Sequence, residues 1–411
     1  MNIALLHYSA PPIVGGVESV LGHHARLMTD AGHRVTIIAG RGEASDDRTK
    51  VRVLPHLDSR HPETMAFKGD LDAGRVPAGF EAARDNLQRA LERELRDSDV
   101  LIAHNVASLN KNLALTAALR GLSGPAKVLW HHDLAWTTPR YRAELHEGYP
   151  WDLLRTPWPD TLQVVVSEFR QIELAALMGL DLASIHVVPN GVDVGAFFKL
   201  EARTRALLRE LPLLDAAPLL LLPVRLTPRK NIGLALRALA SLTRDFPDAQ
   251  LLITGPEGPH NPANAAYKQS LLDLRDALGL RGKAHFLAEL TSDFLPDAVI
   301  ADFYRLADAL ILPSREEGFG IPIIEAGFAH MPVFCSDIAV LRELGGDALT
   351  YFDPDADPAH VAGLIGGGMR SGPGYGWACR ARRHYAWENI YRQRIAPLLA
   401  EALAKSHLQN Q

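Results

Sequence analysis

Two glutamates in the second half of the sequence bracket a turn that could bind a ligand rich in oxygen atoms. Glu317 and Glu325 flank Gly318 and Gly320, between a short apolar run and the start of a helical pattern. Glycines at such a junction let the backbone approach a ligand, and the first turn of the helix offers free N–H groups to anionic or polar oxygens. The pattern predicts a crevice site at the carboxyl ends of parallel strands.

Two cations form a second cluster, earlier in the chain. Arg225 follows Pro218–Val224, whose four consecutive leucines are typical of a strand covered on both faces, and Lys230 stands at the start of a predicted helix. Two cations beside helix N–H groups are suited to holding a diphosphate. Arg229 competes for this role but fits the spacing less well, and a solvated basic turn is the alternative.

The stretch Glu316–Gly327 reads Glu-Glu-Gly-Phe-Gly-Ile-Pro-Ile-Ile-Glu-Ala-Gly and contains the spacing Glu-x7-Glu. It resembles the signature of the retaining glycosyltransferases of family 4, which have the GT-B fold and use nucleotide-sugar donors. Pro313-Ser314, the phrase Pro-Asn-Gly-Val-Asp at Pro189–Asp193 and the Arg225–Lys230 pair extend the match over nearly the whole chain. The resemblance implies an α/β protein of two Rossmann-like, doubly wound domains facing a central cleft.

Length also predicts two domains, because 411 residues exceed one ordinary core. Strand, glycine turn, helix and strand follow one another from the first residues onward, as expected for right-handed βαβ units. We place an acceptor-side domain at 1–195 and a donor domain at 196–379. The resemblance adds a terminal helix, at about 380–411, that crosses back to the first domain.

On the donor side, the resemblance implies that Arg225 and Lys230 stabilise the departing diphosphate and that Glu317 steadies positive charge at the anomeric carbon. Glu325 would bind the ribose hydroxyls. The other donor-binding residues that it implies are Gly15, Gly16, Gly318, Phe319, Gly320, Ile321 and Leu287. It implies no obligatory metal and no other cofactor. The aspartates at positions 353, 355 and 357 come after the Glu-x7-Glu motif and are flanked by prolines, so they are interpreted as a solvated turn and not as an Asp-x-Asp metal site.

On the acceptor side, the sequence His131-His132-Asp133 follows a predicted strand. The resemblance gives His132 a catalytic contact with the donor sugar, with His131 as the competing residue. Structural histidines are the alternative, and a zinc site lacks further ligands at suitable spacing. The irregular segment 130–158 holds four of the six tryptophans, and its rings either bind the acceptor or pack the segment onto the domain. The acceptor candidates are Tyr8, His131, Asp133, Arg140 and Tyr141.

The function expected from these residues is transfer of a hexose from a nucleoside diphosphate sugar to a small polar, saccharide or lipid-linked acceptor, with retention. No nucleophile is evident on the other face of the sugar, so a front-face mechanism is expected, in which the leaving phosphate helps to deprotonate the acceptor. Two alternatives remain. One is an epimerase or phosphorylase of the same fold, and the other is a non-catalytic nucleotide-sugar-binding protein.

Composition limits the partners and the location. A net charge of −5 argues against nucleic acid as a partner. Cys335 and Cys379 are expected to be buried free thiols. No apolar run approaches the roughly 20 residues that cross a bilayer, and residues 1–10 fit a first strand better than a signal peptide. A cytoplasmic enzyme is expected, and this is compatible with a peripheral membrane contact. The polar segment Glu257–Tyr267 is expected to be a loop, and chemistry gives it no role.

Overall fold

The computed structural model describes residues 1–44, 47–257, 262–291 and 294–409. These form two compact α/β units: residues 1–191 together with the segment from Ile390 onward, and Val192–Asn389. From the sequence, the first boundary was expected between residues 195 and 196 and the second at about residue 380. In these units the boundaries lie between residues 191 and 192 and between residues 389 and 390. Among the described residues, no helix is long and apolar enough to pass through a bilayer.

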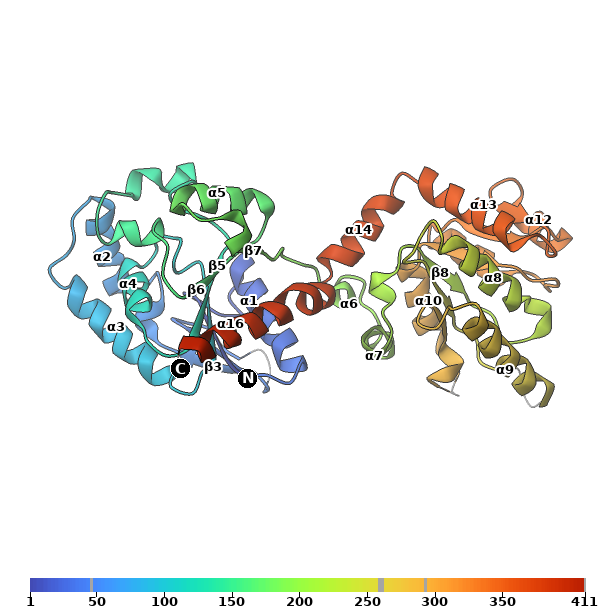
Figure 1. The fold of residues 1–411 in the computed structure, drawn as a ribbon, viewed down its shortest axis with the longest axis horizontal. Helices are drawn as coiled ribbons and strands as arrows, with labels where there is room; N and C mark the ends of the chain where they lie inside the picture. Colours follow the sequence, from blue (N-terminus) through green and yellow to red (C-terminus); the bar gives the residue numbers. More distant parts are fainter. Residues whose placement is uncertain (45–46, 258–261, 292–293, 410–411) are drawn as a thin grey trace. The chain divides into compact units, whose positions relative to one another are not determined.

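The first unit is built on a seven-stranded parallel sheet in the order β3-β2-β1-β4-β5-β6-β7 (Figure 1). Its strands are β1 (Asn2–Leu6), β2 (Arg34–Ala39), β3 (Lys50–Val53), β4 (Val100–His104), β5 (Ala126–His131), β6 (Thr161–Val165) and β7 (Ile185–Val187). The direction of winding reverses between β1 and β4, which pair directly. Residues that follow these two strands therefore lie at a topological switch point.

Helices cover both faces of this sheet, because successive apolar side chains of each strand point to opposite faces. Leu101 and Leu129 point into one core with α3 (Phe80–Glu94) and α4 (Leu113–Gly121), whereas Trp130 contacts α1 (Gly16–Asp30) through His24. The other helices are α2 (Pro62–Asp72), α5 (Glu168–Met178) and the 3₁₀ turns η1 (Pro55–Leu57), η2 (Pro139–Glu144), η3 (Trp151–Leu154) and η4 (Leu182–Ser184).

The last helix of the chain belongs to the first unit. The terminal segment contains α14 (Tyr375–Tyr385), α15 (Trp387–Ile390), a π-helical turn (Tyr391–Ile395) and α16 (Ala396–Gln409). α16 packs against β4 and β5 with Leu398 and Leu399 buried, and Figure 1 shows it beside this sheet.

The second unit has a six-stranded parallel sheet in the order β10-β9-β8-β11-β12-β13. Its strands are β8 (Leu219–Leu222), β9 (Gln250–Ile253), β10 (Ala284–Phe286), β11 (Ala309–Leu312), β12 (Val333–Ser336) and β13 (Thr350–Phe352). The winding reverses between β8 and β11, which pair directly. This sheet therefore has its own switch point, and the two doubly wound domains expected from the sequence are confirmed.

The helices of the second unit fall into two packed groups. α8 packs against α9 and α13, while α10 packs against α7 and α11, as right-handed crossovers to the two sides of β8 require. Their bounds are α6 (Val194–Phe197), α7 (Ala202–Glu210), α8 (Ile232–Leu242), α9 (Pro262–Ala277), α10 (Asp297–Leu306), α11 (Ile321–Phe328), α12 (Ala339–Gly345), α13 (Pro358–Ser371), and the 3₁₀ turns η5 (Leu213–Asp215), η6 (Pro228–Lys230) and η7 (Leu287–Glu289). Cys335 and Cys379 are buried free thiols, as expected.

One local prediction was wrong. Residues 262–267, expected to be part of a loop from Glu257 to Tyr267, begin helix α9. Proline is tolerated in the first turn of a helix, where no intrahelical donor is lost, so Pro262 does not oppose this start. Residues 258–261 lie outside the described part of the chain.

Candidate functional site

The loops after β8 and β11 meet at the switch point of the second domain. Lys230 ends η6, and its Nζ lies 2.6 Å from Oε1 of Glu317, in a pair whose side chains are only 10% and 7% exposed. The Arg315 N–H donates to the Arg229 carbonyl at 2.8 Å, which ties the two loops together. A buried ion pair loses much of its Coulombic gain to desolvation, so its place at two strand ends favours a role in ligand binding.

The two neighbouring arginines differ in availability. Arg229 donates to the Glu316 carbonyl at 3.3 Å. The side chain of Arg225 is exposed and has no ion pair or hydrogen bond within the described parts of the chain. Arg225 is therefore free to bind an anion, and its role in holding the diphosphate stays a prediction, whereas Arg229 helps to hold the loop.

The turn after Glu317 combines a glycine helix cap with two exposed apolar side chains. Gly320 is the N-cap of α11 and has φ of +100°, a conformation that favours glycine. A Cβ at this position would also lie 2.7 Å from Cδ2 of Leu341. Phe319 and Ile321 have exposed side chains. The helix thus starts where the sequence predicted, and binding of a donor by the N–H groups of Gly318–Ile321 stays a prediction.

Glu325 is oriented by a residue that the sequence analysis missed. The Tyr304 hydroxyl, from α10, donates to Oε2 of Glu325 at 2.6 Å. Burial and the neighbouring Glu325 carboxylate raise the pKa of Tyr304, so it stays a neutral donor. The arrangement leaves Oε1 of Glu325 for a ligand hydroxyl.

Gly255 is a second residue that the sequence analysis passed over, in Thr254-Gly255-Pro256 after β9. A Cβ on Gly255 would lie 1.8 Å from the Val224 carbonyl oxygen, so only glycine allows this loop to approach the end of β8. Leu287 follows β10, which is separated from β8 by β9, and its side chain is buried. Any contact between Leu287 and a ligand at the switch point would have to use its backbone.

In the first domain, three histidines connect the ends of β1, β4 and β5. Nδ1 of His7 lies 2.8 Å from the His104 carbonyl oxygen, and Nδ1 of His104 lies 3.1 Å from Nε2 of His132. Asn105, with φ of +59°, accepts from the His132 N–H through Oδ1 at 2.7 Å. His131 instead bonds Gln163 on β6 at 2.8 Å. The structure therefore joins His132, and not His131, to the switch point.

These histidines are neutral because burial opposes their charged form. Burial lowers the pKa of His132 to about 3 and that of His7 to about 4. It lowers the pKa of His24 to about 3, that of His131 to about 4 and that of His104 well below 6.5. At neutral pH the cluster can exchange hydrogen bonds with a ligand but adds no charge.

The side chain of Glu18 explains why a glycine stands in the turn before α1. A Cβ on Gly15 would lie 2.0 Å from Oε2 of Glu18, whose Oε1 accepts from Ser9 Oγ at 2.6 Å. A Cβ on Gly16 would meet no described atom within 4 Å. Gly15 thus makes room for Glu18, and Gly16 is the one of the two that can face a ligand.

The acceptor candidates range from fully buried to exposed. Tyr8 is buried, with its hydroxyl 3.4 Å from each of two backbone carbonyls. Asp133 lies 3.4 Å from Arg170 and 3.7 Å from Arg140, which itself stacks over the ring of Tyr141. The segment's tryptophans are all buried, at positions 130, 136, 151 and 158. Packing therefore accounts for the tryptophan rings. Asp133 and Tyr141, which are partly buried, and the exposed Arg140 remain as a group for an acceptor.

The aspartates after β13 have structural partners. Asp357 caps α13 by accepting from the Ala359 N–H at 2.9 Å, Asp353 accepts from the Asp355 N–H, and Asp355 pairs with Arg315. These contacts agree with the interpretation of this run as a turn.

Two family models match the chain, one for each domain. Residues 14–196 match "Glycosyltransferase Family 4", and residues 205–365 match "Glycosyl transferases group 1". The motif residues Gly15–Gly16, His132, Arg225–Lys230 and Glu317–Glu325 all fall within these ranges.

Several proteins similar to this chain are mannosyltransferases. A phosphatidyl-myo-inositol mannosyltransferase of Mycolicibacterium smegmatis is 29% identical over 89% of this chain and 84% of its own length. A GDP-mannose-dependent alpha-(1-6)-phosphatidylinositol monomannoside mannosyltransferase of Mycobacterium tuberculosis is 27% identical over 82% and 80%. An MMP alpha-(1->4)-mannosyltransferase of Mycolicibacterium hassiacum is 26% identical over 96% and 97%. Together with the two-domain fold and the Glu-x7-Glu turn, these matches show that the chain belongs to the glycosyltransferases of family 4.

Proposed function

We propose that this chain is a retaining mannosyltransferase that moves mannose from GDP-mannose to a hydroxyl of a polyol or saccharide, free or carried on a lipid. The donor is proposed because relatives at 26–29% identity over most of the chain carry mannosyltransferase names, one of them naming GDP-mannose. The acceptor class follows from the inositol and mannoside acceptors in those names and from the polar Asp133–Arg140–Tyr141 group.

The Lys230–Glu317 pair is the observation that carries the proposal. An ammonium and a carboxylate at 2.6 Å, in a nearly buried pair, would stand beside the two ends of the bond that breaks. Lys230, with Arg225, would stabilise the negative charge that develops on the departing diphosphate. Glu317 would stabilise the positive charge that develops at the anomeric carbon.

Retention is proposed from both chemistry and relatives. GDP-mannose carries its sugar in an α linkage, and two of the relatives are named for α products. A double displacement needs a carboxylate nucleophile about 5 Å from a second carboxyl group, across the scissile bond. Glu317 is already paired with Lys230, so we propose that attack occurs on the face from which the diphosphate leaves, with that diphosphate accepting the acceptor's proton. No metal is needed for this step.

The first test is the unfolding temperature with GDP, UDP or ADP. A ligand that binds only the folded state, at 100 times its dissociation constant, adds about 2.7 kcal/mol to stability. GDP alone should raise the unfolding temperature. A shift with UDP or ADP alone would contradict the proposed donor, and no shift with any nucleotide would contradict the donor site itself.

The second test is product analysis with GDP-mannose and a panel of inositol phosphates, an inositol phospholipid and methyl mannosides. Nuclear magnetic resonance of the product should show an α-mannosidic linkage. A β linkage would contradict retention. Conversion of the donor without any acceptor would favour an epimerase, and nucleotide binding without turnover on any acceptor would favour a binding protein.

A further inference from the structure

Three potential metal ligands converge in the first domain, outside the residues described so far. His56 lies in η1, His61 is the N-cap of α2, and Glu63 follows in the first turn of that helix. Each offers one ligand atom, and the three atoms all lie within 4.8 Å of one another. Nδ1 of His56 is 3.0 Å from Oε2 of Glu63, and the two imidazole rings have centroids 4.3 Å apart.

One nitrogen of this group needs a partner. Nδ1 of His61 is buried and makes no hydrogen bond to any described residue. A buried polar atom without a partner is costly, and such atoms point to a ligand, an ion or an ordered water. A bond to a metal ion, or to a water bound to that ion, would satisfy it.

We propose that His56, His61 and Glu63 bind one divalent transition-metal ion, preferentially Zn²⁺. Two imidazoles and one carboxylate form a well-known zinc ligand set that leaves a fourth position open. Bonds of about 2.0–2.1 Å in a tetrahedral site place the ligand atoms about 3.3–3.5 Å apart. The ligand atoms now lie within 4.8 Å of one another, so the group must close by up to about 1.5 Å. His56 and Glu63 can make this movement because their side chains are 58% and 49% exposed.

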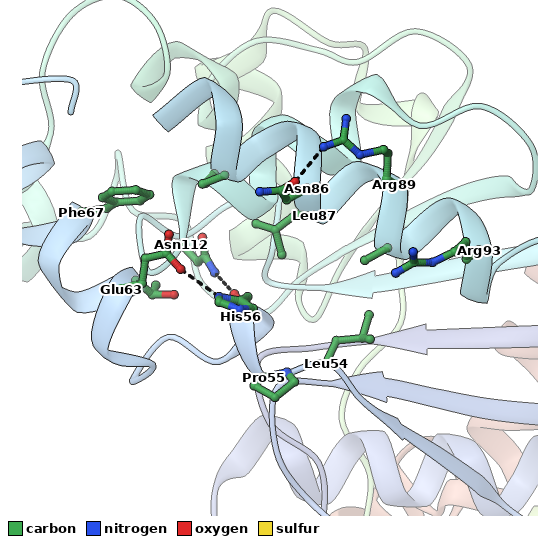
Figure 2. Close-up of a pocket in the computed structure, with 14 residues that line it drawn as sticks. Leu54, Pro55, His56, Glu63, Phe67, Asn86, Leu87, Arg89, Arg93 and Asn112 are labelled. Atoms are coloured by element: carbon green, nitrogen blue, oxygen red, sulfur yellow. Dashed lines mark hydrogen bonds and ion pairs between the residues drawn. The ribbon is translucent and has the colours of Figure 1, made fainter. Parts of the chain in front are cut away.

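The open position of the metal would face a pocket of about 380 Å³ that His56 and Glu63 line. Figure 2 shows these two residues at one end of the pocket and Arg93 at the other, with Leu87 between. A metal at one end and arginines at the other favour an anionic ligand, a phosphate or a carboxylate. The pocket lies beside β3, the outer strand of the sheet, so this site is separate from the switch point between β1 and β4.

A comparison within the same domain separates this group from an ordinary ion pair. His186 and Glu401 also form a histidine–carboxylate contact, at 3.3 Å. This pair belongs to no group of three ligands among the described residues. His186→Ala is therefore a matched control, since it removes a histidine beside a carboxylate without touching the proposed site.

The experiment uses the full chain without a histidine tag, freed of metal with a chelator and titrated with Co²⁺ and then Zn²⁺. We expect one ion per chain, a visible Co²⁺ band of tetrahedral intensity, and displacement of Co²⁺ by Zn²⁺. Glu63→Gln and His61→Ala should each weaken binding by more than about tenfold, because even partners beyond the direct ligands are worth 10–100-fold. His186→Ala should bind like the unaltered chain.

Three results would overturn the proposal: absence of saturable Co²⁺ binding, equal binding by Glu63→Gln and the unaltered chain, or equal weakening by His186→Ala.

A second experiment adds inorganic phosphate to the Co²⁺-loaded chain. Phosphate should shift the Co²⁺ band by entering the open position. An unchanged band would overturn the assignment of that position to the pocket. None of these readouts depends on glycosyl transfer, so their outcome is independent of the proposed function.

Discussion

In the second domain, the ammonium of Lys230 lies 2.6 Å from the carboxylate of Glu317 and joins the loops after β8 and β11. Lys230→Ala should lower turnover by about 10²-fold or more, because it removes charge stabilisation from the transition state. It should also destabilise the domain by up to about 3–5 kcal/mol, since it leaves a nearly buried carboxylate without its partner.

A double variant separates these two effects. Lys230→Met with Glu317→Leu replaces both charges by apolar groups and should recover most of the stability without recovering turnover. Stability is best followed by hydrogen–deuterium exchange of β8 and β11, since the two domains need not unfold together. Normal turnover in the single variant would remove Lys230 from the mechanism.

Gly320→Ala should destabilise the donor turn by about 1–3 kcal/mol, because the φ of +100° is strained for alanine and the new Cβ approaches Leu341. The same displacement of the turn should raise the KM for the donor. Gly318→Ala is the matched control, since its Cβ would meet no described atom within 4 Å. Equal effects of the two substitutions on KM and stability would contradict a specific need for glycine at position 320.

Tyr304→Phe should raise the KM for the donor several-fold, because Glu325 loses the hydroxyl that orients it. Its effect on stability should be about 1 kcal/mol or less, since water can reach the exposed carboxylate of Glu325. Tyr351→Phe is the control, because that hydroxyl bonds only the Leu341 carbonyl, at 3.3 Å, among the described residues. Steady-state kinetics against donor concentration measures both, and unchanged kinetics in Tyr304→Phe would remove it from donor binding.

The first domain should lose stability as the pH falls from about 6.5 to about 4. Burial lowers the pKa of His24 to about 3 and those of His7 and His131 to about 4, against 6.5 for an exposed histidine. In this window the unfolded chain therefore binds more protons than the folded one, so stability decreases with decreasing pH. Each such histidine contributes a slope of at most about 1.4 kcal/mol per pH unit.

Denaturant unfolding followed by tryptophan fluorescence measures this slope, because four of the six tryptophans lie in the first domain. His24→Phe should make the slope shallower, whereas His186→Gln, at a partly exposed site, should leave it unchanged. An unaltered slope in His24→Phe would show that this histidine does not titrate on unfolding.

Much of the donor side could be predicted from the sequence, because its residues lie in short local patterns. The turn at Gly320 and the helix that starts at Ile321 could be predicted from neighbouring residues. Lys230 follows a strand that the run of leucines predicts. Tyr304 could not be predicted, because its contact with Glu325 depends on how α10 packs against α11. Gly255 was missed for a similar reason, since only the neighbouring Val224 carbonyl makes its lack of a side chain necessary.

On the acceptor side, the sequence identified candidate residues but could not show which residues each of them contacts. The sequence could not choose firmly between His131 and His132, because the choice depends on which neighbouring strand each ring faces. The structure directs His131 to Gln163 and His132 to His104. Likewise, the segment's tryptophans could have been ligands or core, and only burial distinguishes the two. The roles of all these residues in catalysis stay predictions.

The return of α16 to the first domain has a consequence for biosynthesis. The first unit lacks this helix until about 200 further residues have been translated, since it stops at residue 191 and resumes at 390. At about 5–20 residues translated per second, β4 and β5 of the nascent chain stay without α16 for roughly 10–40 s. The second unit is contiguous and can finish folding on the ribosome before the first.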